Sequence, residues 1–170
     1  MAAQTKNDRR SQRTRRRLGD ALTALMLEKP YDRITVQDII ARADVGRSTF
    51  YAHFDGKDGL LSANFEWLLD QLDRAWTAAG PPRLVFPVAQ FFEHVRQHRG
   101  LYEALTRGRG LEFLFTRGHA AVARKIERQL ERWPGLADGP AAIPRPALAH
   151  IAAGALLAWL RWWLDNKRPY

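Results

Sequence analysis

The sequence contains no cysteine, and this absence excludes several functions at once. A chain without thiols cannot form disulfides, bind a metal through cysteine, hold an iron–sulfur cluster or use a thiol nucleophile. Serine is also scarce, with Ser11, Ser48 and Ser62 as its three examples. No nucleophile can be grouped with a histidine and a carboxylate, so we do not expect an enzyme.

Targeting and membrane signals are also weak. The amino-terminal basic run leads into an amphipathic segment from Leu18 rather than an apolar stretch, so we expect no secretory leader and a cytoplasmic protein. Residues 147–164 are apolar apart from His150 and Arg161, and their number would permit a membrane span. A buried helix is the favoured interpretation, because a polar tail follows, and the membrane span is the alternative.

Negative charge is in short supply. The chain has 27 Lys and Arg against 18 Asp and Glu, a formal net charge of +9. Seven of the basic residues lie in the first 17 positions, where Asp8 is the one acidic residue. A partner with many negative charges is therefore expected at this end, and we predict that Arg15 and Arg16 belong to an arm that contacts DNA.

Apolar residues recur with a helical period along the chain, and no strand pattern or repeat is present. Leu18, Leu22 and Leu25 predict a helix over 11–29 that Pro30 ends. Further helices are predicted at 60–79, 84–99 closed by Gly100, 101–106, 111–133 with an interruption at Gly118, and 147–166, with loops around Gly108 to Gly110 and over 134–146. The sequence thus predicts an all-α protein, with a DNA-binding domain over 1–58 that includes the arm at 1–17, and a helical sensing and dimerisation domain over 59–170.

Two short helices separated by a tight turn lie within Thr35–His53. Thr35 and Asp38 have the spacing of a capping box, and Asp44 and Gly46 permit a sharp turn before a second helix from Arg47. This is the arrangement of a helix-turn-helix, whose second helix enters the major groove. That helix needs few apolar residues for packing and leaves five hydrogen-bonding side chains free, namely Arg47, Ser48, Thr49, Tyr51 and His53.

The run from Thr35 to Phe54, TVQDIIARADVGRSTFYAHF, followed by Lys57, Asp58 and Leu60, resembles the DNA-binding signature of the TetR family. The resemblance implies a three-helix DNA-binding domain and a helical bundle behind it. It also implies contacts with phosphate from Thr35, with bases and adjacent phosphates from Arg47, Ser48 and Thr49, and with the backbone from Tyr51, His53 and Lys57. Asp44 and Gly46 depart from the family's preferred Gly and Ser.

The same resemblance implies a homodimer on double-stranded palindromic operator DNA, acting as a repressor and released by a small apolar ligand. Aromatic side chains abundant enough to line such a pocket are Phe65, Trp67, Phe91, Phe92 and Phe113. The alternatives are control by a protein partner and non-specific DNA binding. No cofactor is expected, and His94 with His98 has the spacing of a metal pair but no third ligand that the sequence can place.

The last helix is apolar around its whole circumference, so both of its faces must be covered. In a small domain the natural second partner is the same helix of another subunit. We therefore predict a dimer interface that includes Ala152, Ala155, Leu156, Trp159 and Trp163.

Overall fold

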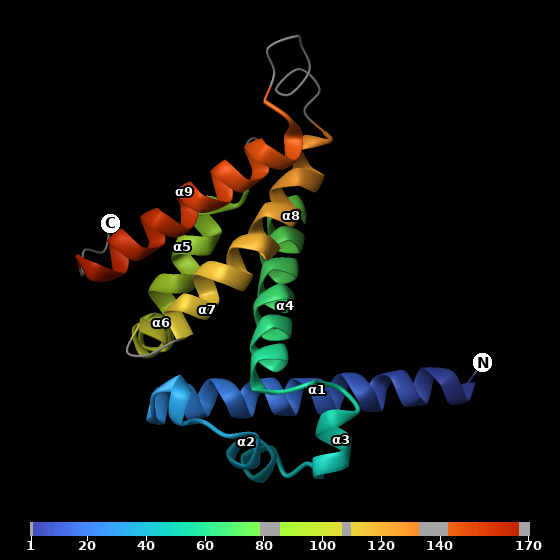
Figure 1. Cartoon of the computed structure of the whole chain (residues 1–170). Helices are drawn as coiled ribbons and strands as arrows, with labels where there is room; N and C mark the ends of the chain where they lie inside the picture. The colour runs from blue at the N-terminus through green and yellow to red at the C-terminus, as the bar shows by residue number, and fades with distance from the viewer. Residues whose placement is uncertain (1, 79–85, 107–109, 133–142, 167–170) are drawn as a thin grey trace. The chain divides into compact units, whose positions relative to one another are not determined.

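The computed structural model describes residues 2–78, 86–106, 110–132 and 143–166, and every regular element in these ranges is helical (Figure 1). The prediction of an all-α fold is confirmed. The elements are α1 (Ala2–Glu28), the 3₁₀ turn η1 (Tyr31–Arg33), α2 (Val36–Ala43), α3 (Arg47–Tyr51), α4 (Lys57–Ala78), α5 (Val88–Gln97), α6 (Arg99–Thr106), α7 (Gly110–Phe113), the π-helical turn η2 (Leu114–Gly118), α8 (His119–Leu130) and α9 (Arg145–Asp165).

The chain divides into two units. Unit 1 comprises Met1–Asn64 with Glu103–Leu111, and unit 2 comprises Phe65–Tyr102 with Glu112–Tyr170. The division falls inside α4, whose first turns belong to unit 1, whereas the sequence placed the domain boundary at residue 58.

Unit 1 is built on the buried stripe of α1. Leu18 and Leu22 have no exposed surface, and α1 packs against α2, which contributes the fully buried Ile39. Phe50 of α3 is also fully buried. The apolar spacing that predicted these helices therefore marks the residues that form the core of unit 1.

The structure extends α1 well beyond the predicted start. The sequence predicted a helix from Ser11, whereas α1 begins at Ala2. The added turns carry no apolar stripe, so the hydrophobic period could not reveal them. Their alanine, glutamine and basic residues are nevertheless good helix formers, and these propensities are consistent with a helical arm.

Unit 2 has its core between α8, α9 and parts of α4 and α5. The α8 and α9 helices pack closely against one another. Their buried side chains meet the fully buried Phe91 of α5 and Leu69 of α4. The largest fully buried members from α8 and α9 are Ile126, Leu130, Leu157 and Leu160.

Three predicted helix boundaries in this part of the chain are wrong. Gly100 lies inside α6 rather than ending α5, which ends at Gln97 with a cap at His98. Gly110 begins α7 instead of lying in a loop. Pro146 belongs to the first turn of α9, where a helix tolerates proline because that position needs no amide donor.

The interruption predicted at Gly118 takes the form of the π-helical turn η2, which ends at this residue. The backbone stays helical through Gly118, so α7, η2 and α8 follow one another without a loop. The predicted loop at Gly108, the predicted helix ends at Leu84, Ala79 and Trp133, and most of the loop over 134–146 lie outside the described residues.

Candidate nucleic-acid interface

The start of α2 is fixed by the reciprocal cap that the sequence predicted. The Asp38 amide donates to Thr35 Oγ1 at 3.1 Å, and the Thr35 amide donates to Asp38 Oδ2 at 2.8 Å. Lys29 Nζ lies 2.8 Å from the same carboxylate oxygen. Its hydrogen bond, followed by those from Thr35, holds the pKa of Asp38 well below its usual range. Thr35 Oγ1 donates to Asp38 as well, so a phosphate contact by this hydroxyl would compete with the cap.

The turn between α2 and α3 depends on Asp44. Its φ of 50° lies in the left-handed region, which aspartate tolerates better than most residues, and it ends α2. Arg17 Nη2 of α1 donates to both the carbonyl oxygen and Oδ2 of Asp44, each at 3.2 Å. The sequence did not reveal this clamp, because nothing in the pattern links two residues 27 positions apart.

The short helix α3 presents polar side chains from a rigid base. Phe50 is fully buried and packs edge-to-face on Tyr51, with 5.3 Å between ring centres. Arg47, Ser48 and Thr49 are all exposed. The Arg47 guanidinium lies 5.5 Å from the centre of the Tyr51 ring, and this contact restrains the arginine on the open side of the helix.

Lys57 has a different environment from the one expected of a phosphate clamp. Its ammonium donates to the carbonyl oxygens of Tyr31 and Ile34, both at 2.9 Å, and to that of Asp32 at 3.4 Å. It also lies 4.5 Å from the centre of the Tyr31 ring, while the Tyr31 hydroxyl donates to Asp58. Lys57 therefore closes the end of η1 from within unit 1, a role that its position in the motif did not indicate.

The other residues predicted to contact DNA lie in different environments. The Arg15 guanidinium lies 5.9 Å from the centre of the Phe54 ring. Arg16 is exposed and has Asp20 4.0 Å away on the same helix. His53 is half-buried beside Phe54. The structure thus brings Arg47, Ser48, Thr49 and Tyr51 together on α3, whereas Arg15, Arg16 and Lys57 have contacts elsewhere in unit 1.

The predicted ligand pocket residues lie in different environments of unit 2. Phe91 is part of the core, Phe65 and Phe92 are partly buried against it, and Phe113 is half-buried. Trp67 is 63% exposed, because it lies two positions before the buried Leu69 and the helical period turns it to the opposite side of α4. The structure therefore places Trp67 at the surface and not in the interior.

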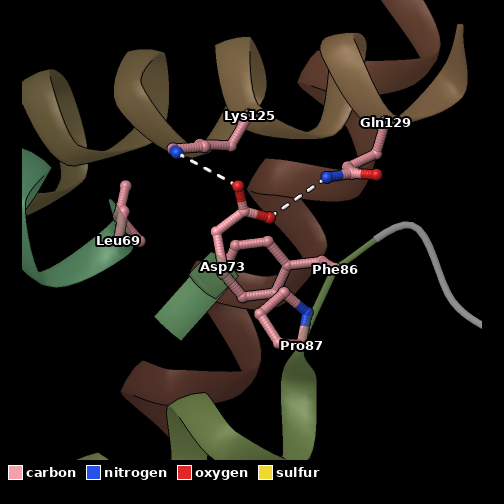
Figure 2. A pocket seen from close by; sticks show the side chains of 6 residues that line it. All are labelled: Leu69, Asp73, Phe86, Pro87, Lys125 and Gln129. Atoms are coloured by element: carbon pink, nitrogen blue, oxygen red, sulfur yellow. Dashed lines mark hydrogen bonds and ion pairs between the residues drawn. The ribbon is translucent and has the colours of Figure 1, made fainter. Parts of the chain in front are cut away.

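A small cavity of about 10 Å³ lies elsewhere in unit 2, lined by Leu69, Asp73, Phe86, Pro87, Lys125 and Gln129. Figure 2 shows Lys125 and Gln129 of α8 pointing toward Asp73 of α4, with Phe86 and Pro87 beside them. Gln129 Nε2 donates to Asp73 at 3.1 Å, and Lys125 Nζ lies 3.5 Å from the same carboxylate. This volume is close to the minimum that holds one water molecule.

The α9 helix has one buried face and one exposed apolar face. Leu156 and Trp163, predicted for a dimer interface, are only 6% and 5% exposed and pack in the core of unit 2. Ala155 and Trp159 are exposed, and Ala152 is partly buried. Because apolar residues surround the helix, the sequence could not tell which of them face the subunit's own core. By its length and apolar composition α9 could also cross a membrane. Buried core helices of soluble proteins can have the same length and composition.

The exposed apolar face of α9 also contains two residues that the predicted interface left out. Ile151 is 59% exposed and Trp162 is 44% exposed. Together with Ala155 and Trp159 they recur at intervals of four or three residues, which places them along one side of the helix. We refer to Ile151, Ala155, Trp159 and Trp162 as the α9 outer face.

His94 of α5 and His98, the residue that caps this helix, lie one turn apart, and their rings stack with 4.2 Å between centres. Burial, and secondarily the neighbouring His98, lowers the pKa of His94 from 6.5 to about 4. Among the described residues, no group of three or more His, Cys, Asp or Glu side chains could hold a metal ion.

The geometry of unit 1 defines a helix-turn-helix DNA-binding protein: a capped α2, a tight turn and an α3 that exposes hydroxyl and guanidinium groups. Residues 18–63 match the family model described as bacterial regulatory proteins, tetR family. The chain is 29% identical over 164 residues to the HTH-type transcriptional repressor KstR of Mycolicibacterium smegmatis, covering 90% of this chain and 78% of that protein. The KstR repressor of Mycobacterium tuberculosis is 27% identical, with 90% and 72% covered.

Solved structures agree with this assignment. A TetR transcriptional regulator from Streptococcus agalactiae matches 98% of this chain and 90% of its own, with a TM-score of 0.63 and 26% identity. A putative TetR-family regulator from Syntrophomonas wolfei has the same fold, with a TM-score of 0.62, 20% identity and 91% and 84% covered. The amino-terminal segment thus matches the DNA-binding module of the tetR family, and over most of its length the chain is similar to TetR-type DNA-binding transcriptional regulators.

Proposed function

We propose that this regulator is a homodimeric repressor that places α3 of each subunit in the major groove of a palindromic operator. The observation that carries the proposal is the exposed set of Arg47, Ser48 and Thr49 on a helix anchored by the fully buried Phe50. The two KstR relatives are named as transcriptional repressors, which supports repression as the outcome of binding.

The side chains on α3 have chemistry suited to reading a duplex. An arginine in the major groove donates two parallel hydrogen bonds to the O6 and N7 atoms of guanine, whereas serine and threonine hydroxyls bond to bases or to phosphates. Tyr51 lies against Arg47, so the guanidinium loses less freedom when it docks than an unrestrained arginine would. We assign base reading to Arg47 and positioning on the backbone to the hydroxyls.

A second copy of the chain is the proposed occupant of the α9 outer face. Two tryptophans and an isoleucine in one stripe form an apolar surface that water solvates poorly, and Ala155 between them permits close approach. An isologous contact of this kind places identical helices around a two-fold axis, which matches the symmetry of a palindrome. In this arrangement both apolar sides of α9 are covered without a membrane, as expected of a cytoplasmic regulator.

The signal that releases the repressor stays a prediction. The cavity beside Asp73 has room for about one water molecule, so a small apolar ligand that bound there would have to widen it. Such a ligand would weaken operator binding only if it bound more tightly to the conformation of the repressor that fits the operator poorly. Control by a protein partner is the alternative, and thermal stabilisation of the dimer by a panel of apolar compounds would distinguish the two.

Selection of bound sequences from a random duplex library tests the proposal. We expect enrichment of a palindrome whose half-sites lie about 10 base pairs, or a multiple of that, apart. The triple variant Arg47→Ala/Ser48→Ala/Thr49→Ala should lose the enriched motif. Arg128→Ala, which removes an exposed arginine from α8, is the control and should retain it. Enrichment of no discrete sequence by the wild-type protein would contradict the proposal and favour non-specific binding.

A further inference from the structure

The amino-terminal turns of α1 form a basic helix that precedes the segment matched by the family model, which begins at residue 18. The arginines at 9, 10, 13, 15, 16 and 17 are all exposed. In Figure 1 these turns project beyond α3 toward the amino terminus. The proposed function leaves open which of these arginines meet DNA.

Two contacts determine which side of α1 faces the helix-turn-helix. Arg17 reaches the turn between α2 and α3 through its two hydrogen bonds to Asp44. Gly19 faces α4 instead, because Asn64 Nδ2 donates to its carbonyl oxygen at 3.2 Å. Figure 1 agrees, with α2 and α3 on one side of α1 and the start of α4 on the other.

The helical period then sorts the arginines into two groups. Arg10 and Arg13 precede Arg17 by seven and four residues, so they lie on the side of the α2–α3 turn. Arg15 and Arg16 precede Gly19 by four and three residues, so they lie on the α4 side. The Arg15 guanidinium also lies 5.9 Å from the centre of the ring of Phe54, which packs on Phe50, so Arg15 already has a contact within unit 1.

We propose that Arg10 and Arg13 form a rigid phosphate-binding edge that follows the operator backbone next to each half-site. The inference rests on the proposed DNA-binding function and differs from the sequence prediction, which chose Arg15 and Arg16. Arg17 does not take part directly, because its guanidinium holds Asp44 and offsets that residue's negative charge beside the groove.

The dimensions and the rigidity of the arm suit this role. From Arg10 to Arg13 the helix rises about 4.5 Å, which is a little more than one base-pair step of a duplex, so the two arginines can meet neighbouring phosphates. A helical arm is already ordered before binding, so its arginines meet phosphates at a smaller entropic cost than those of a flexible tail. The contacts would carry no sequence information and would extend the footprint outward from the half-site.

Two charge-matched double variants test the proposal. Arg10→Ala/Arg13→Ala and Arg15→Ala/Arg16→Ala each remove two exposed positive charges per subunit, and circular dichroism melting checks that both remain folded. Affinity is measured against salt concentration on the selected operator and on a random duplex of equal length. The slope of log affinity against log salt should become shallower by about 3 to 4 for the Arg10/Arg13 dimer, since each lost phosphate contact accounts for about 0.9. It should change by less than 1 for the Arg15/Arg16 dimer.

Hydroxyl-radical footprinting of the Arg10/Arg13 variant should lose the outermost protected phosphates while retaining those of the half-sites. Equal slopes for the two double variants, or an unchanged slope for Arg10/Arg13, would overturn the assignment. Because phosphate contacts do not depend on sequence, the slope comparison holds on both duplexes. If the wild-type protein bound the operator and the random duplex with equal affinity, the proposed function would be refuted. The salt slopes of the two double variants would still test the role of Arg10 and Arg13.

Discussion

Both α3 and α9 bury one side in the core of their own unit and leave the other side exposed, but the exposed chemistry is opposite. The outer side of α3 carries Arg47, Ser48 and Thr49 around the buried Phe50, whereas the α9 outer face carries Trp159, Trp162 and Ile151. Polar donors on a rigid helix suit a hydrated polyanion, and large apolar side chains suit a surface that excludes water. The same chain therefore exposes two surfaces of opposite chemistry, a polar one on α3 that suits DNA and an apolar one on α9 that suits another protein surface.

The largest expected effect comes from placing charge on the α9 outer face. Ile151→Glu/Ala155→Glu introduces two like charges that a two-fold contact would bring together, so the dimer should dissociate and operator affinity should fall at least 100-fold. Sedimentation equilibrium and gel shift measure these two effects. Leu27→Glu on α1 is the control for oligomeric state, because Leu27 is 59% exposed, as Ile151 is. A double variant that remains dimeric would remove α9 from the interface.

On the α3 side, a single arginine should account for a sizeable share of specificity. Arg47→Ala removes one bidentate base contact of about 1–3 kcal/mol from each half-site, so operator affinity of the dimer should fall by about 2–6 kcal/mol, or at least about 30-fold. Repeating the sequence selection with this variant should show relaxed preference at one position of each half-site. Uniform weakening on every sequence, without relaxed preference, would reassign Arg47 to the phosphate backbone.

Replacing Lys57 distinguishes two roles for this residue, which could stabilise the fold of unit 1 or contact DNA. Lys57→Met keeps the aliphatic chain but removes the donors to three carbonyl oxygens, so we expect unit 1 to lose about 1–3 kcal/mol of stability. Urea denaturation measures this loss. The salt dependence of DNA binding should stay the same as in the wild type, and a slope shallower by about 2 per dimer would instead make Lys57 a phosphate contact.

A smaller effect is expected in unit 2, from His94. Its pKa is lowered to about 4 in the folded protein, so the unfolded chain takes up this proton more readily. The stabilisation is therefore complete above pH 6.5 and is lost as the pH falls from 6.5 toward 4. We expect a loss on the order of 1 kcal/mol, because the ring is partly exposed and solvent screens its interactions. His94→Phe should flatten this part of the stability curve, and an unchanged curve would exclude His94 as its source.

The sequence predicted the DNA-binding unit in more detail than the rest, for physical reasons. Short-range rules determine the cap at Thr35 and Asp38 and the left-handed turn at Asp44, and both are confirmed. Contacts between residues distant in sequence, such as Arg17 with Asp44 and Lys57 with Tyr31, leave no local pattern. The orientation of α9 could not be predicted because an all-apolar helix has no polar side to mark the solvent. The predicted DNA contacts, ligand pocket and dimer interface stay predictions.

The distance between the two α3 helices tests the central claim most directly. Since the chain has no cysteine, Ala52→Cys at the exposed end of α3 can be spin-labelled at a single position per subunit. Pulsed electron paramagnetic resonance of the labelled protein bound to its selected operator should give one distance near 34–36 Å, the repeat of the DNA helix, or a multiple of it. Absence of dipolar coupling in a fully bound sample, or a distance unrelated to the helical repeat, would contradict a dimer that holds two recognition helices in the major groove.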